Sequence, residues 1–143
     1  MILFCDTSAW VKRYLVEDGG KSVVAAVQVA TVVALARVTW VESMSAFARR
    51  EREQPAATRG IAAARVQFRL DWPQCLVLKL TRDVTDLAGE YCEAFALRAA
   101  DSVQLTSAQV LRQRVGEDVA FLGFDQRLAK AAALLSLPAP VIG

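Results

Sequence analysis

Short apolar runs alternate with longer segments of helical periodicity along the chain, and this alternation constrains the fold more than any other feature. The apolar runs predict strands at residues 2–5, 31–36, 75–80 and 119–124. The segments between and after them predict helices at residues 9–16, 21–30, 39–54, 56–70, 83–95, 99–115 and 126–135. Strands separated by helices form parallel sheets covered by helices on both faces, so the predicted class is α/β.

Local features refine this outline. The predicted apolar face of the helix at 39–54 consists of Val41, Met44, Phe47 and Ala48. The helices at 39–54 and 56–70 are expected to form an antiparallel hairpin. Asp83 is expected to cap the helix at 83–95, and residues 138–142 are expected to add a last short strand. Because the chain has no internal repeat and no linker-like stretch, residues 1–143 are predicted to form a single domain.

The sequence contains no histidine, which excludes a Ser-His-Asp triad, a histidine general base and a histidine zinc site. Any enzymatic chemistry must therefore come from carboxylates, a metal or a cofactor. Cys5, Cys75 and Cys92 are scattered in apolar surroundings, which favours reduced core thiols in a cytoplasmic protein. No apolar run has the length expected of a membrane span or of a secretion signal.

Four carboxylates lie in apolar surroundings, where charges are rarely left without a partner. Asp6 and Asp125 directly follow predicted strands, whereas Glu42 and Asp101 lie within predicted helices among small or apolar neighbours. Because the carboxyl ends of parallel strands meet at one edge of a sheet, we expect Asp6 and Asp125 to lie at the same edge. Each acid alone also fits a structural role, such as a helix cap or a first-turn acid.

A shared divalent cation explains the four acids together. Clustered carboxylates repel one another, and some remain protonated near neutral pH unless a cation neutralises them. Mg²⁺ prefers oxygen ligands and bridges to phosphate groups, and it acidifies a bound water that can attack phosphorus. The residues therefore predict hydrolysis of a phosphodiester bond without histidine.

The motifs around these acids resemble those of the PIN-domain ribonucleases, in particular the VapC toxins of bacterial VapBC toxin–antitoxin pairs. The segments that carry the resemblance, in order, are Phe4–Glu17, Val41–Arg50, Leu97–Ala108 and Phe124–Ala132. The resemblance implies a three-layer α/β/α sandwich around a parallel sheet, and endonucleolytic cleavage of RNA with Mg²⁺ or Mn²⁺. It also implies that Asp6, Glu42, Asp101 and Asp125 hold the metal and that Ser8 supports the site.

The resemblance further implies a homodimer, held inactive by a VapB-like antitoxin that reaches into the acidic pocket, often with an arginine. Two positions depart from the family pattern. Gly123 stands where the family often has Thr, Ser or Asn, and Ser102 stands where Ala is common. Neither departure removes an acid, but Gly123 leaves support of the metal to other residues.

The stretch from residue 49 to residue 69 is basic, with six arginines against two glutamates. Arg49, Arg50 and Arg52 can contact RNA phosphates in such a stretch. The same residues also fit a solvated helix face with pairs such as Glu53 and Arg49. Charge alone leaves both interpretations open.

Two other classes of protein share parts of this pattern. A response-regulator receiver has an acidic Mg²⁺ site on a parallel sheet, but it needs an acidic pair after the first strand and an aspartate after the third. This chain has Asp6-Thr7 and Leu80-Thr81-Arg82 at those places, which argues against a receiver. A non-catalytic PIN-like module that binds RNA or regulates is the alternative function. Cleavage of RNA that requires Mg²⁺ distinguishes it from a nuclease.

Overall fold

The computed structural model describes residues 1–141. At its centre is a parallel sheet of four strands in the order β3-β2-β1-β4. The strands are β1 (Ile2–Cys5), β2 (Val32–Ala36), β3 (Leu76–Leu78) and β4 (Val119–Leu122). The first two strands along the chain therefore pair with each other, and the last strand returns to lie beside the first.

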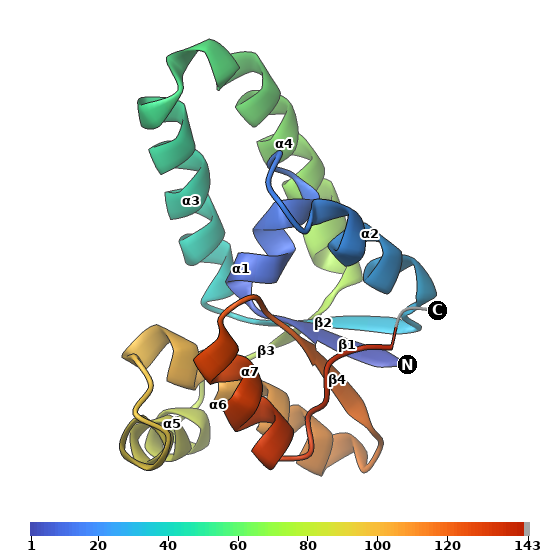
Figure 1. The fold of residues 1–143 in the computed structure, drawn as a ribbon, viewed down its shortest axis with the longest axis vertical. Coiled ribbons are helices and arrows are strands. Elements are labelled where there is room, and N and C mark those ends of the chain that lie inside the picture. The colour runs from blue at the N-terminus through green and yellow to red at the C-terminus, as the bar shows by residue number, and fades with distance from the viewer. Residues whose placement is uncertain (142–143) are drawn as a thin grey trace.

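Helices cover both faces of this sheet. The helices are α1 (Thr7–Trp10), α2 (Gly20–Val29), α3 (Thr39–Glu53), α4 (Thr58–Asp71), α5 (Arg82–Ala94), α6 (Ala99–Val115) and α7 (Gln126–Leu134). Short 3₁₀ turns are η1 (Val11–Arg13), η2 (Pro55–Ala57) and η3 (Trp72–Gln74). Figure 1 shows α1 to α4 on one side of the sheet and α5 to α7 on the other. The predicted α/β/α sandwich is thus confirmed. Within residues 1–141, none of the helices is long and apolar enough to cross a membrane.

The two faces have different cores, because side chains of a strand point alternately to opposite faces. Leu3 and Cys5 face the α1–α4 layer, whose core is rich in aromatic rings that include Trp10 and Phe68. Phe4 faces the α5–α7 layer, whose core is mostly Leu, Ala and Val. The alternation along β1 therefore separates an aromatic core from an aliphatic one.

Helices α3 and α4 lie side by side and project away from the sheet as the predicted hairpin (Figure 1). At its base, the Phe47 and Phe68 rings meet edge to face with centroids 5.6 Å apart. Further out, Arg65 of α4 pairs with Glu51 of α3 at 2.8 Å. The pair proposed from sequence between Glu53 and Arg49 is not among the ion pairs of the described residues.

Several predicted boundaries were wrong. The helix expected from residue 9 begins at Thr7, since Asp6 accepts the N–H of Ala9 as its cap, and it tightens to a 3₁₀ turn at Val11. The edge strand β3 and the strand β4 are shorter than predicted, ending at residues 78 and 122. The cap of α5 is Thr81 rather than Asp83, because the Thr81 hydroxyl accepts the N–H of Val84.

Two further expectations also changed. Val41 is 62% exposed rather than inward, because its neighbour Trp40 takes the inward position and packs on Phe68. Residues 138–141 form no strand, although the Phe121 N–H donates to the Pro138 carbonyl at 2.8 Å. Ile142, the last residue of that predicted strand, lies outside the described residues.

Candidate functional site

Two of the four candidate carboxylates follow the carboxyl ends of the neighbouring strands β1 and β4. β1 and β4 run in register with Cys5 beside Leu122, and the N–H of Asp6 donates to the Leu122 carbonyl at 3.0 Å. Asp6 directly follows β1, and Asp125 follows β4 as the cap of α7. Both acids therefore lie at the same edge of the sheet, where open parallel sheets place ligands. Glu42 and Asp101 lie in the first turns of α3 and α6.

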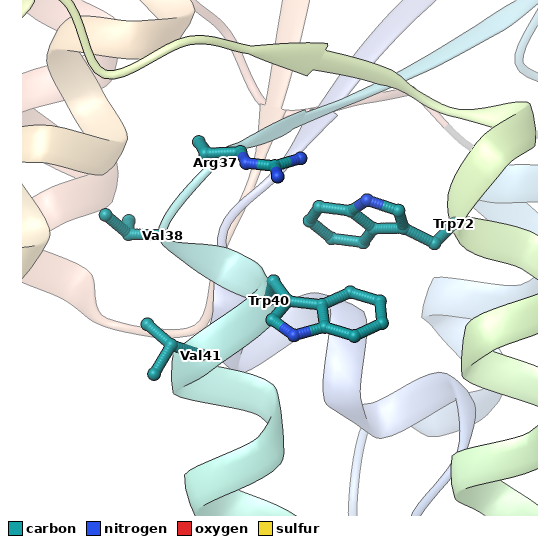
Figure 2. A pocket seen from close by; sticks show the side chains of 5 residues that line it. All are labelled: Arg37, Val38, Trp40, Val41 and Trp72. Atoms are coloured by element: carbon teal, nitrogen blue, oxygen red, sulfur yellow. The ribbon is translucent and has the colours of Figure 1, made fainter.

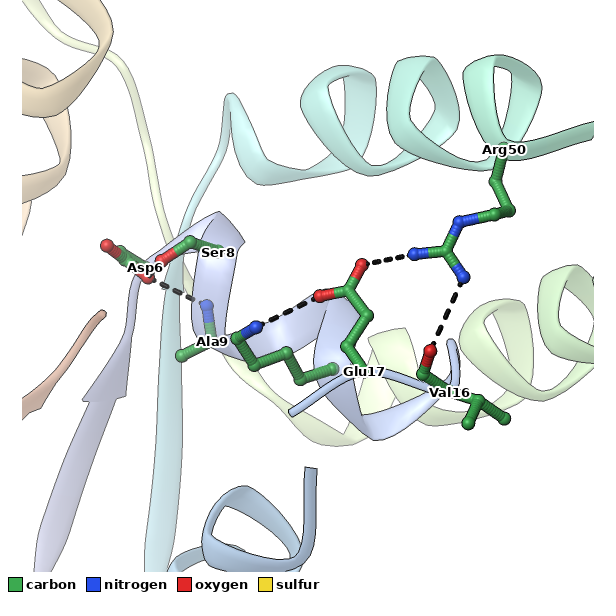
Figure 3. A network of polar contacts seen from close by, with 7 residues as sticks. Asp6, Ser8, Ala9, Val16, Glu17 and Arg50 are labelled. Atoms are coloured by element: carbon green, nitrogen blue, oxygen red, sulfur yellow. Dashed lines mark hydrogen bonds and ion pairs between the residues drawn. The ribbon is translucent and has the colours of Figure 1, made fainter. Parts of the chain in front are cut away.

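Asp6 is the most enclosed of the four acids, with 4% of its surface exposed. Its Oδ1 accepts hydrogen bonds from the Ser8 hydroxyl at 2.7 Å and from the Ala9 N–H at 2.9 Å (Figure 3). Burial raises the pKa of Asp6 to about 6, against the effect of these two donors, and the charges of Asp101 and Glu42 add to the rise. Ser8, which the resemblance implies supports the site, thus donates to the Asp6 carboxylate.

Glu42 is held at the same edge by hydrogen bonds from polar side chains that were not among the predicted site residues. Its Oε1 accepts hydrogen bonds from Thr7 Oγ1 at 3.0 Å and from Gln104 Nε2 at 2.9 Å. Gln104 Nε2 also lies 3.0 Å from the hydroxyls of Thr7 and Thr39. Gln104, 2% exposed, therefore joins the starts of α1 and α3 to the middle of α6.

Gln104 was not among the predicted site residues, although the sequence contains a feature that indicates its role. Helix α6 is buried on nearly every side, and the polar residues Ser102, Gln104, Thr106 and Ser107 are buried with its apolar ones. A polar side chain that is buried must find partners. Gln104 comes one turn after Asp101, so its partners lie beside the acids. Helical periodicity alone could not identify these partners of Gln104, because Glu42 is 62 residues away from Gln104 in the sequence.

Asp101 and Asp125 border an open pocket of about 330 Å³. Its lining consists of Ala96, Leu97, Arg98, Asp101, Asp125, Gln126 and Arg127. Asp125 is exposed, and its Oδ1 accepts the Leu128 N–H at 2.9 Å. The pKa of Asp101 is raised, first by partial burial and then by the charge of Asp125, while Arg98 lowers it. The pocket thus brings carboxylates and guanidinium groups to one place.

Gly123 is close to Asp6 because the chain turns there between β4 and α7. A Cβ at this position would lie 2.7 Å from Oδ2 of Asp6 and 3.2 Å from the Phe121 ring. A hydroxyl residue therefore does not fit beside Asp6 as that carboxylate lies. Glycine at position 123 therefore makes room for Oδ2 of Asp6, rather than leaving an empty space where the family has a side chain.

The four acids are linked by their charges but do not form a closed ligand set. Among residues 1–141, no group of three or more His, Cys, Asp or Glu side chains is close enough to surround one metal ion. Asp6 is influenced by Glu42 and Asp101, and Asp101 is influenced by Asp125. The shared edge predicted for Asp6 and Asp125 is therefore confirmed, and joint binding of one metal by all four acids stays a prediction.

The three arginines singled out from sequence differ in their contacts. Arg50 pairs with Glu17 at 2.6 Å and reaches the Val16 carbonyl at 3.4 Å (Figure 3). Glu17 also pairs with Lys12 at 3.0 Å. Arg49 and Arg52 are exposed, and their side chains contact no acid among the described residues. Of these three arginines, Arg49 and Arg52 therefore keep guanidinium groups that no acid within residues 1–141 pairs with.

The comparisons with known proteins agree with this architecture. The family model of the PIN domain matches residues 3–134, so the chain belongs to the PIN-domain family. Among solved structures, the fold is similar to that of Mycobacterium tuberculosis VapC20, which is described as a sarcin-ricin loop cleaving toxin. The TM-score is 0.65, the sequence identity is 18%, and the match covers 90% of this chain and 94% of VapC20. No curated protein matches the chain by sequence.

Proposed function

We propose that this protein is a metal-dependent endoribonuclease and the toxin component of a VapBC-type toxin–antitoxin pair. The observation that carries the proposal is the enclosed carboxylate of Asp6, which is influenced by the charges of Glu42 and Asp101 at the ligand-binding edge of a PIN-domain sheet. A buried carboxylate whose pKa is raised by neighbouring acids is a typical feature of a functional site.

The donor set fits Mg²⁺ or Mn²⁺. Mg²⁺ usually keeps several waters and takes one or two carboxylates together with substrate phosphates, so it does not need a closed protein cage. Asp6, Glu42, Asp101 and Asp125 are the proposed ligands, and the charges of Glu42 and Asp101 acting on Asp6, and of Asp125 acting on Asp101, support this assignment. Such a metal, when bound there, would supply the Lewis acid and the activated water in place of a histidine base.

The chain's own residues have separate tasks in this proposal. Ser8 and the Ala9 N–H orient the Asp6 carboxylate. Thr7 and Gln104 orient Glu42 through its Oε1. Asp101 and Asp125 border the open pocket through which RNA reaches the edge, and the guanidinium groups of Arg98 and Arg127 beside them offer contacts to phosphate.

Regulation and assembly follow from the same proposal. A VapB-like antitoxin would silence the enzyme by placing a basic side chain against the uncompensated acids. The proposal also includes that the protein forms a homodimer and is located in the cytoplasm. The RNA substrate cannot be transferred from VapC20, because similarity at 18% sequence identity shows a shared fold but not a shared substrate.

The proposal is tested by incubating the purified protein with RNA in Mg²⁺, in Mn²⁺ and in EDTA. We expect cleavage with either metal and none in EDTA. Asp101→Asn should abolish cleavage, whereas the matched change Asp86→Asn on the exposed surface of α5 should leave it intact.

Two outcomes would contradict the proposal. Cleavage that continues in EDTA, or that Asp101→Asn leaves unchanged, would remove the metal and the acids from the reaction. Binding of RNA without cleavage in any metal would instead favour the non-catalytic RNA-binding or regulatory PIN-like module.

A further inference from the structure

A second cavity lies beside the acidic edge, on the far side of the first turn of α3. It has a volume of about 480 Å³ and is lined by Arg37, Val38, Trp40, Val41 and Trp72 (Figure 2). Its lining comes from the end of β2, the start of α3 and the turn η3. Its size falls in the range of pockets that bind small organic groups.

The aromatic part of this cavity is rigid. The Trp40 and Trp72 rings meet at 73° with centroids 5.2 Å apart, and the Trp40 ring also packs on Phe68 at 5.3 Å. Trp72 is 9% exposed, while Trp40 is half-buried and presents part of its ring to the cavity. Because their neighbours fix both rings, they form an aromatic wall that loses little freedom when a flat group packs against it.

Arg37 gives this wall a positive charge. Its backbone is fixed, because its N–H donates to the Leu78 carbonyl at 2.9 Å and its carbonyl accepts the Trp40 N–H at 3.3 Å. Its side chain is exposed and has neither a hydrogen bond nor an ion pair within residues 1–141. Figure 2 shows the guanidinium across the cavity from Trp40 and directed toward the Trp72 side. A free guanidinium beside aromatic rings suits a ligand that is both flat and anionic.

The cavity borders the first turn of α3, which carries Glu42, one of the proposed catalytic acids. Val41 directly precedes Glu42, and the Glu42 N–H donates to the Val38 carbonyl at 3.0 Å. The exposed Val41 side chain thus forms an apolar rim next to one of the carboxylates. The first turn of α3 thus carries both a residue of the cavity rim and one of the proposed catalytic carboxylates.

We propose that this cavity binds an unpaired base of the RNA substrate against Trp40 and Trp72, with Arg37 contacting the adjoining phosphate. The inference rests on the proposed function, since it extends the substrate path from the same edge. Single-stranded RNA is typically held by aromatic stacking combined with arginine contacts to the backbone. Charge favours RNA over an apolar protein segment, because the free guanidinium would otherwise be covered without a partner.

The test measures RNA binding without cleavage, using a fluorescently labelled single-stranded RNA in EDTA. Arg37→Gln and Val41→Asp change exposed side chains, so the fold should be kept. Arg37→Gln should weaken binding roughly 10- to 100-fold, the usual effect of losing a hydrogen bond to a charged group, and Val41→Asp should act in the same direction by repelling phosphate. The matched control is Arg114→Gln in the last turn of α6, which should bind as the wild type does. A double-stranded RNA of equal length should bind more weakly than the single strand.

Quenching of tryptophan fluorescence locates the bound base. The chain has three tryptophans, and Trp10→Phe removes the one outside the cavity, which leaves Trp40 and Trp72 as reporters. Single-stranded RNA should quench this variant, and the added Arg37→Gln change should reduce the quenching at equal RNA concentration.

The outcomes separate this inference from the nuclease proposal. If wild-type protein cleaves no RNA but binds it with dependence on Arg37, the nuclease proposal fails and the cavity assignment stands. If Arg37→Gln and Val41→Asp bind and cleave RNA as the wild type does, the cavity assignment is overturned. Unchanged RNA binding with weaker capture of a partner protein by these variants would assign the cavity to that protein instead.

Discussion

Two pairs of acids at the same sheet edge differ in how firmly they are held. The held pair is Asp6 and Glu42, whose oxygens accept hydrogen bonds from Ser8, Thr7 and Gln104 as well as the Ala9 N–H. The open pair is Asp101 and Asp125, which border the 330 Å³ pocket. Within the described residues, the only side-chain hydrogen bond of this pair is the helix cap made by Asp125.

This difference indicates that the two pairs of acids have different roles in the proposed site. The held pair is positioned before any ligand arrives, at the cost of burying charge close to other charges. The open pair can rearrange around a metal or a phosphate, because water and neighbouring arginines reach it. A site built in this way keeps its geometry on one side and admits substrate on the other.

The largest expected effect is on cleavage. Asp6→Asn and Asp125→Asn should each lower the rate at least ~100-fold, since a metal contributes several kcal/mol to the reaction. A high Mg²⁺ concentration should partly restore Asp125→Asn, because water can replace a ligand at an exposed position. It should not restore Asp6→Asn, where the site is enclosed. The check is the initial rate of cleavage against Mg²⁺ concentration for both variants.

Two controls accompany this experiment. Asparagine can keep the cap on Ala9, so circular dichroism should show that Asp6→Asn is folded. Equal rescue of the two variants by Mg²⁺ would show that the held pair and the open pair do not differ.

The next effect concerns stability and pH. Because burial first, and then Asp101 and Glu42, raise the pKa of Asp6 from 3.8 to about 6, the folded protein holds a proton that the unfolded chain has already released between these values. Stability should therefore fall as the pH rises from about 4 through about 6, by up to about 3 kcal/mol from this group. Asp6→Asn removes this loss, so its advantage over wild type should grow across the same interval.

Urea unfolding in EDTA at several pH values measures this difference. Asp101→Asn should show the same sign with a smaller gain, because Asp101 is more exposed. Added Mg²⁺ should stabilise the wild type near neutral pH more than it stabilises Asp6→Asn. A gain of Asp6→Asn that is the same at every pH would mean that the charge of Asp6 is not its cause.

The held pair should also depend on Gln104. Gln104→Leu removes the amide that donates to Glu42, and loss of such an orienting partner typically lowers activity or metal affinity about 10- to 100-fold. The matched control is Gln109→Leu on the same helix, since Gln109 is also buried but contacts none of the acids. Cleavage rate and Mg²⁺ dependence should change only for Gln104→Leu. Equal effects of both variants would reduce Gln104 to a packing residue.

The sequence predicted the features that depend on local pattern. It placed Asp6 and Asp125 after parallel strands, and it gave α6 as residues 99–115, the bounds that the structure has. The features it missed depend on contacts between distant segments. Gln104 meets Glu42 only because α6, on the other face of the sheet, approaches the starts of α1 and α3 at the shared edge. Arg50 meets Glu17 across 33 residues. The exposure of Val41 likewise follows from Trp40 packing on α4, which helical periodicity does not contain.

The smallest effects are expected among the arginines of α3. Arg50 is held by its ion pair with Glu17, so Arg50→Gln should lower stability by roughly 0.2–1 kcal/mol, the usual range for such surface pairs. Arg49 and Arg52 are free, and their joint replacement by Gln should weaken binding of single-stranded RNA if that helix face contacts phosphates. The slope of log affinity against log salt should then fall by about 0.7 for each lost contact. A slope that stays unchanged in the double variant, while Arg37→Gln lowers it, would place the RNA path at the tryptophan cavity rather than along the hairpin.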